Sequence, residues 1–340
     1  MASERRARCL AVSLAAMGLG CTAPAAADHC PEAPASAPIV AAATIASAAL
    51  PPALPPARSR AERALEDSAI LTLEPIAGFG PNAEVFAATL AAPAESATLT
   101  LSLASAPTAY RRPLAYARLA AALGMHVVPA AVERQLGAGE ITALLAPHPE
   151  IAAPLVGRLR VLNDGTVTAL LSASAPGVHG EIAAAVRVES RDSFEARTWA
   201  RWAASLEPAS DERPRTTRDF VETLALDYLA ANVTRRTLLL DRDGLVLDDN
   251  REAFPRSVEP LAVDRLLRRL RPVARFPRGL RDALVAFDPE RARQALAPGA
   301  FEGWLVSPRA LIELEERRAG LLSLLEARIA ERGAAAVLSL

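Results

Sequence analysis

The order of the hydrophobic patterns constrains the fold of this chain more than any other feature. Between residues 68 and 172, apolar and polar residues alternate in short runs, as they do in half-buried strands. From residue 194 onward, apolar residues recur mainly at helical spacing. A strand-rich lobe followed by a helical lobe is the order of an α+β fold, which we therefore predict.

The boundaries follow from turn residues and prolines. We expect strands over residues 68–76, 84–90, 97–104, 127–132, 237–240 and 245–248, and a hairpin over residues 158–172 around Asn163-Asp164-Gly165. We expect helices over residues 114–123, 194–206 and 218–231. Residues 258–338 are also expected to be helical, with breaks at Pro272, Pro277, Pro289, Pro298 and Pro308.

The first residues are typical of an export signal. Three arginines within residues 5–8 precede a short apolar run at residues 10–19, and we assign residues 1–27 to a signal peptide. Two processing routes remain open. Cys21 could be acylated as in a lipoprotein, although Gly18 stands where leucine is usual, or cleavage could follow the alanines at 25–27. Either route predicts an exported bacterial protein, periplasmic or anchored in a membrane only through its lipid.

Residues 28–66 are rich in alanine and proline, and the last prolines of this segment are Pro55 and Pro56. Such a composition cannot bury a core, so we predict a disordered linker. The remaining chain is divided into residues 67–135, the strand-rich lobe, and residues 136–340, a hairpin with the helical lobe.

The composition of the 340 residues excludes some functions. The net charge is -1, which gives no reason to expect nucleic acid as a partner. The chain contains no lysine, so its basic residues are arginine and histidine. A phosphate-binding lysine, on which most ATP-dependent phosphoryl transfer relies, is therefore impossible.

Four segments together resemble the atypical kinase superfamily, which includes HipA-type toxin kinases, secretory-pathway Golgi kinases and phosphoinositide kinases. They are the glycine turn at residues 78–86, the Arg-Arg-Pro segment with its helix at 111–129, the Asp-Tyr-Leu-Ala-Ala-Asn segment at 227–236, and the Leu-Asp-Asp-Asn segment at 247–254. The resemblance spans roughly residues 70–260. It implies a two-lobed protein-kinase-like fold.

The resemblance also implies roles for individual residues. Gly78, Gly80 and Asn82 would lie over nucleotide phosphates, Asn232 would contact the nucleotide site, and Asp249 would bind a metal. The implied cofactor is ATP with Mg²⁺ or Mn²⁺.

The same resemblance places unsuitable residues at the catalytic positions. Ser102 stands near the lysine position, Pro113 at that of its glutamate partner, Thr234 at that of the catalytic aspartate, and Leu239 at that of a metal-supporting asparagine. Because each missing group normally supplies a few kcal/mol of transition-state stabilisation, their joint loss predicts a pseudokinase that binds a protein partner in the cell envelope.

Two alternatives remain. The chain could be an active kinase that uses Asp227 or Asp248 as its base and an arginine as its phosphate cation. It could also be a structural envelope protein with coincidental motifs. In the pseudokinase interpretation, by contrast, Asp227 is a scaffold residue. Arg235 and Arg236 are expected to be a solvated pair.

Overall fold

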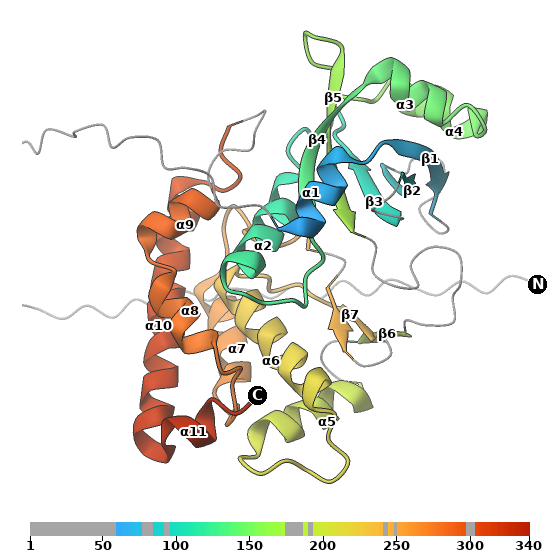
Figure 1. Ribbon diagram of the computed structural model, residues 1–340. Helices are drawn as coiled ribbons and strands as arrows, with labels where there is room; N and C mark the ends of the chain where they lie inside the picture. The colour runs from blue at the N-terminus through green and yellow to red at the C-terminus, as the bar shows by residue number, and fades with distance from the viewer. Residues whose placement is uncertain are drawn as a thin grey trace, which may run out of the picture. The chain divides into compact units, whose positions relative to one another are not determined.

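The computed structural model describes residues 59–76, 84–91, 96–173, 186–189, 193–240, 244–247, 250–296 and 303–340. These residues form a strand-rich lobe up to Ala173 and a largely helical lobe after it (Figure 1). The α+β order predicted from the hydrophobic pattern is confirmed.

A five-stranded antiparallel sheet, in the order β1-β2-β3-β5-β4, forms the strand-rich lobe. In β3, Leu99 and Leu101 are buried on one face while Thr98 and Thr100 are partly exposed on the other. The strands are β1 (Ile70–Pro75), β2 (Val85–Leu90), β3 (Ser96–Leu101), β4 (Ala131–Gly137) and β5 (Thr166–Ala173).

The leucine-bearing face of the sheet is covered by three short helices. Their buried side chains Leu65, Ile141 and Leu155 join one apolar core with this face. Arg134 of β4 donates hydrogen bonds to the carbonyls of Leu65, at 3.3 Å, and Ser68, at 2.7 Å, and so ties the first helix to the sheet. The helices are α1 (Arg60–Asp67), α3 (Ala138–Leu144) and α4 (Pro149–Val156).

The structure corrects two expected boundaries. Residues 60–66 were assigned to the disordered linker, but they belong to α1, whose Leu65 is only 2% exposed. The strand-rich lobe was expected to end at residue 135, but β4 continues past that position and pairs with β5 along its whole length. Pairing between distant segments fixes this boundary, and local sequence carries no signal for it. The predicted signal peptide and the linker up to residue 58 lie outside the described residues.

Some local predictions also need correction. The strand expected over residues 127–132 begins only at Ala131, after Pro129. The hairpin around Gly165 is present but short on its first side, because Val161 forms only a single bridge, to Val167. The helices α3 and α4 were not predicted.

The helical lobe has its own core, to which α2 (Arg111–Ala122) of the first lobe also contributes. Proline occupies the first position of α6, α7, α9 and α10, where its missing N–H would have no helical partner anyway. The helices are α5 (Phe194–Ala204), α6 (Pro214–Leu229), α7 (Pro260–Leu270), α8 (Leu280–Ala286), α9 (Pro289–Ala295), α10 (Pro308–Arg332) and α11 (Ala334–Val337). A small sheet contains β6 (Val186–Glu189), β7 (Thr237–Leu240) and β8 (Leu245–Val246).

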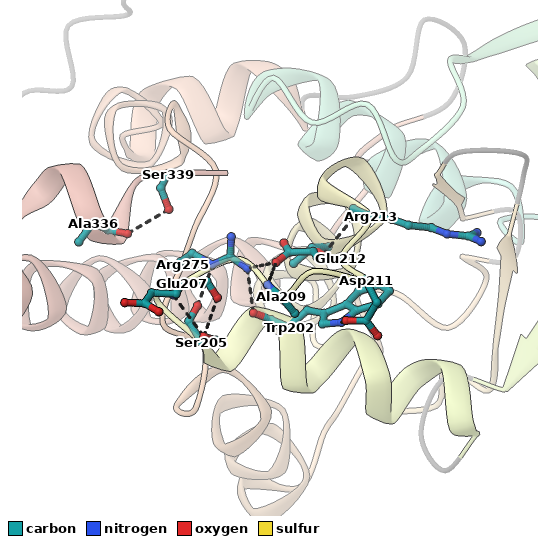
Figure 2. A network of polar contacts seen from close by, with 11 residues as sticks. Trp202, Ser205, Glu207, Ala209, Asp211, Glu212, Arg213, Arg275, Ala336 and Ser339 are labelled. Carbon is teal, nitrogen blue, oxygen red and sulfur yellow. Dashed lines mark hydrogen bonds and ion pairs between the residues drawn. The ribbon is translucent and has the colours of Figure 1, made fainter.

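A buried arginine joins the α5–α6 connection to the segment after α7, as Figure 2 shows. Arg275 is 3% exposed and donates hydrogen bonds to the carbonyls of Ser205, at 2.7 Å, and Trp202, at 2.9 Å. Its guanidinium also pairs with Glu212 at 2.6 Å. The Nε and Nη2 groups of this arginine therefore have protein acceptors in place of lost water, as a buried charge requires.

A carboxylate on α6 holds the start of β8. Asp219 accepts a hydrogen bond from the backbone N–H of Leu245 at 2.9 Å. A side chain at Gly244 would collide with this carboxylate, so the close approach requires glycine. Burial is the main reason that the pKa of Asp219 rises from 3.8 to about 6, although the bond from Leu245 opposes the rise.

This shift predicts a pH dependence. Between pH 3.8 and about 6 the folded chain holds a proton on Asp219 that the unfolded chain has released, so this group makes folding more favourable as the pH falls. Asp219→Asn keeps the acceptor and removes the titration. We expect the variant to be more stable than the wild type at about pH 7.5, by about 1–3 kcal/mol, with the gain vanishing at about pH 4. Urea unfolding at both pH values measures this, and an equal difference at both would contradict it.

Candidate functional site

The loop that follows α6 has an unusual backbone. Ala231 has a φ of 51°, a left-handed conformation that costs a residue with a side chain about 1–2 kcal/mol. Two backbone hydrogen bonds of 2.8 Å hold this shape, from Asn232 N–H to the carbonyl of Asp227 and from Phe254 N–H to that of Ala230. Phe254 is also in a left-handed conformation, with a φ of 49°. The surrounding structure therefore imposes the conformation of this loop.

Four buried polar side chains, which we call the Asp227 cluster, lie against the loop. Asp227, 1% exposed, accepts hydrogen bonds from Arg235 Nε, at 2.9 Å to Oδ1 and 2.8 Å to Oδ2, and from the hydroxyl of Tyr116 at 2.9 Å. Arg235 also donates through Nη2 to Asn250 Oδ1 at 2.7 Å. The cluster thus connects α2, α6, the loop and the segment after β8.

The cluster is charged although it is buried. Burial is the largest single influence on Arg235 and lowers its pKa, but the charge of Asp227, the neighbouring Tyr116 and the hydrogen bonds to both together outweigh it, and the pKa rises. Burial likewise raises the pKa of the Asp227 carboxyl, and the guanidinium opposes that rise. Since arginine keeps its proton at any ordinary pH, the two side chains form an ion pair. Burial also raises the pKa of Tyr116 well above its usual value, so its hydroxyl remains a donor.

This geometry determines what Asp227 can do. Both of its carboxylate oxygens are engaged by Arg235, and the side chain does not face water. A general base must instead reach a substrate hydroxyl within hydrogen-bond distance. Asp227 therefore serves as a scaffold that shapes the loop, as the sequence indicated. The expectation of a solvated arginine pair is wrong for Arg235, which is 5% exposed, whereas Arg236 is exposed.

The four residues that the resemblance aligned with catalytic positions, Ser102, Pro113, Thr234 and Leu239, have the following surroundings. Thr234 is exposed at the end of the loop, and Leu239 is buried as a core residue of β7. Ser102 is buried and donates its hydroxyl to the carbonyl of Pro107 at 2.8 Å. Pro113 lies in the first turn of α2 and is partly buried. No side chain at these four positions supplies a charge.

Asn232 differs from these positions. Its side chain is 1% exposed, and within the described residues its Oδ1 atom has no hydrogen-bond partner. An unsatisfied buried acceptor has an energetic cost and is compatible with a missing ligand. The predicted ligand contact of Asn232 therefore stays a prediction. Several other predicted site residues lie outside the described residues: Gly78, Gly80, Asn82, Asp249 and Cys21.

Two members of the Asp227 cluster were not singled out from the sequence. Tyr116 lies in α2 between Ala115 and Ala117, all of them buried, so its hydroxyl had to find a partner inside the protein. This polar atom on an apolar helix face was the available signal. Asn250 carried no comparable signal, because its contact with Arg235 depends on the tertiary fold.

The described residues do not include a complete site for a nucleotide with a divalent metal, since Gly78, Gly80, Asn82 and Asp249 lie outside them. Within the described ranges, no three His, Cys, Asp or Glu side chains lie together in a way that could hold a metal ion. Lysine is absent from the sequence, and Asn232 offers one free oxygen. We therefore derive no chemical step through such a group.

Among the described helices, none combines the length and the apolar character needed to cross a bilayer.

Comparisons with known proteins identify the fold. A crystal structure of the Golgi casein kinase with Mn/ADP bound matches with a TM-score of 0.55 and 17% identity, over 82% of this chain and 77% of that chain. A second structure of that kinase gives the same values. The structure of hydra Fam20 with sugar matches with a TM-score of 0.54 and 15% identity, over 81% of this chain and 90% of that chain. No protein-family model and no curated protein matches the sequence. The chain therefore has a kinase-like fold, and at these identities the likeness extends to the fold alone.

The Asp227 cluster generates a stability prediction. Asp227→Asn removes the carboxylate and leaves the buried guanidinium of Arg235 without its counter-charge. Breaking a buried ion pair in this way costs about 3–5 kcal/mol. The matched control is Glu290→Gln, which removes an exposed pair with Arg293 and should cost less than about 1 kcal/mol. Urea unfolding measures both, and similar losses for the two variants would refute the structural role of the cluster.

Proposed function

We propose that this chain is a kinase-like protein that does not transfer phosphate and that acts by binding a protein partner, with at most weak binding of nucleotide. The observation that carries the proposal is the Asp227 cluster. The buried acid of the catalytic-loop segment is fully engaged by Arg235, and the position that the resemblance gives to the catalytic base is occupied by Thr234. A threonine hydroxyl has no useful basicity near neutral pH.

The phosphate side of the site supports the same proposal. The lysine and the glutamate that would hold nucleotide phosphates are replaced near Ser102 and at Pro113, and Ser102 uses its hydroxyl to bond Pro107. Phosphoryl transfer depends almost entirely on positioning and on stabilising charge, so the loss of these charges should abolish it.

One alternative keeps a specific observation in its favour. The Golgi casein kinase matched by this chain was crystallised with Mn/ADP, which is compatible with an active kinase that uses relocated residues. Of the two acids considered as a relocated base, Asp227 is buried and paired, and Asp248 lies outside the described residues. The second alternative was a structural envelope protein with coincidental motifs, and the kinase-like fold speaks against the coincidence of the motifs.

A transfer assay tests the proposal. We expect the full chain, incubated with radiolabelled ATP and either Mg²⁺ or Mn²⁺, to show no autophosphorylation and no ATP turnover above the Asp249→Ala variant. ATP should bind with a dissociation constant of about 1 mM or weaker, or not at all. An active kinase assayed in parallel is the positive control. Turnover that disappears in Asp249→Ala would establish the active alternative instead.

We further propose that the chain is exported and held at a membrane through Cys21. The arginines and the apolar run before this cysteine support the proposal. Expression with a labelled fatty acid should give a labelled protein, and Cys21→Ser should lose the label. A wild type that is exported without label would show simple secretion.

A further inference from the structure

The second face of the sheet, opposite the core with α1, α3 and α4, presents an unusual set of side chains. In β4 and β5, Val132, Leu136 and Leu171 point into that core, so the odd-numbered residues of β4 and the even-numbered residues of β5 point to the second face. Ala131 and Leu170 on this face pack into the core of the helical lobe. The second face is thus the side of the sheet that meets the helical lobe.

Glu133 carries the single charge that β3, β4 and β5 place on this face. The strand register aligns it with Leu170 of β5 and, one strand further, with Thr100 of β3. Ser102, near the position of the missing lysine, follows two residues later and bonds through its N–H to the carbonyl of Thr168 at 3.0 Å. Phosphate transfer needs a positive charge at the lysine position that the resemblance assigns near Ser102, and the charge of β3, β4 and β5 on this face is a negative one.

Among the described residues, the carboxylate of Glu133 has no hydrogen-bond partner. The residue is 7% exposed, and within the described part of the chain neither carboxylate oxygen has a hydrogen bond. Thr168, 1% exposed, is a diagonal neighbour of Glu133 across the β4–β5 pair, and its hydroxyl also has no partner among these residues. Two buried side chains at diagonal positions therefore keep three oxygen atoms without partners among the described residues, whereas buried polar atoms in native proteins are nearly always satisfied.

From this juxtaposition we propose that Glu133 and Thr168 form a binding site for an organic cation that carries N–H donors, such as a primary ammonium or a guanidinium group. A carboxylate accepts several such hydrogen bonds, and charge assistance makes them strong. The inference rests on the proposed function, since an active kinase would hold nucleotide phosphates near this face. The carboxylate oxygens are covered in this structure, so binding includes a local opening step.

Other ligands fit this pair less well. A phosphate would be repelled by the carboxylate of Glu133. Mg²⁺ and Ca²⁺ take six or more oxygen ligands, usually with more than one acid, and no group of three metal-binding side chains occurs among the described residues. An ammonium or a guanidinium needs no more than the carboxylate and the hydroxyl present.

Calorimetric titration of the full chain with agmatine, which carries both cationic groups, tests the proposal. We expect saturable binding to the wild type, a loss of affinity of about tenfold or more in Glu133→Gln, and a smaller loss in Thr168→Val. Glu195→Gln, the same charge change at an exposed position on α5, should bind like the wild type. Tighter binding of the tripeptide Gly-Arg-Gly than of agmatine would indicate that the cation belongs to a polypeptide, and the reverse order would indicate a free amine. Either order supports the proposal.

The outcomes that overturn the proposal are distinct from failure of the proposed function. Absence of saturable agmatine binding to the wild type, or equal binding to Glu133→Gln, shows that Glu133 is merely a buried acid. Binding of Mn²⁺ that is lost in Glu133→Gln assigns the site to a metal instead. If Glu133→Gln does not fold, unchanged agmatine binding to Thr168→Val overturns the proposed pair. Phosphate transfer is measured separately and fails or succeeds independently of these results.

Discussion

The fold depends most on the buried ion pair between Asp227 and Arg235. Two charges removed from water are stable only when their hydrogen bonds are satisfied, and here Tyr116 and Asn250 supply the remaining bonds. The bond from Tyr116 to Asp227 spans 111 residues of sequence and joins α2, which follows the first strands, to α6 in the helical lobe. This bond therefore ties the two parts of the chain together while the pair shapes the loop. Because both of its carboxylate oxygens accept hydrogen bonds from Arg235, Asp227 is not available as a general base.

Much of the architecture could be predicted because it depends on local pattern. Strand alternation located β1, β2 and β3, the prolines located the starts of α9 and α10, and helical spacing located α5 and α6. What local pattern could not supply was pairing. The sheet continues through β5 because of ladder bonds to β3 and β4, segments far apart in sequence. The helices α3 and α4 were missed because each is short, and they depend on the sheet for burial.

The candidate site was predicted only where motif order carried the information. The scaffold role of Asp227 followed from its segment, but the burial of Arg235 did not, since an Arg-Arg pair is usually solvated. Glu133 had no sequence signal at all. Its isolation depends on strand register, which turns its side chain away from Val132 and Leu136 toward the helical lobe. Whether a charged side chain has a partner depends on its three-dimensional surroundings.

The two left-handed residues of the loop, Ala231 and Phe254, have a shared consequence. The bond from Phe254 to the carbonyl of Ala230 links both strained positions, so neither can relax while the other is held. Opening of one should release the other, and the amide protons of Asn232 and Phe254 should exchange with solvent as one cooperative unit.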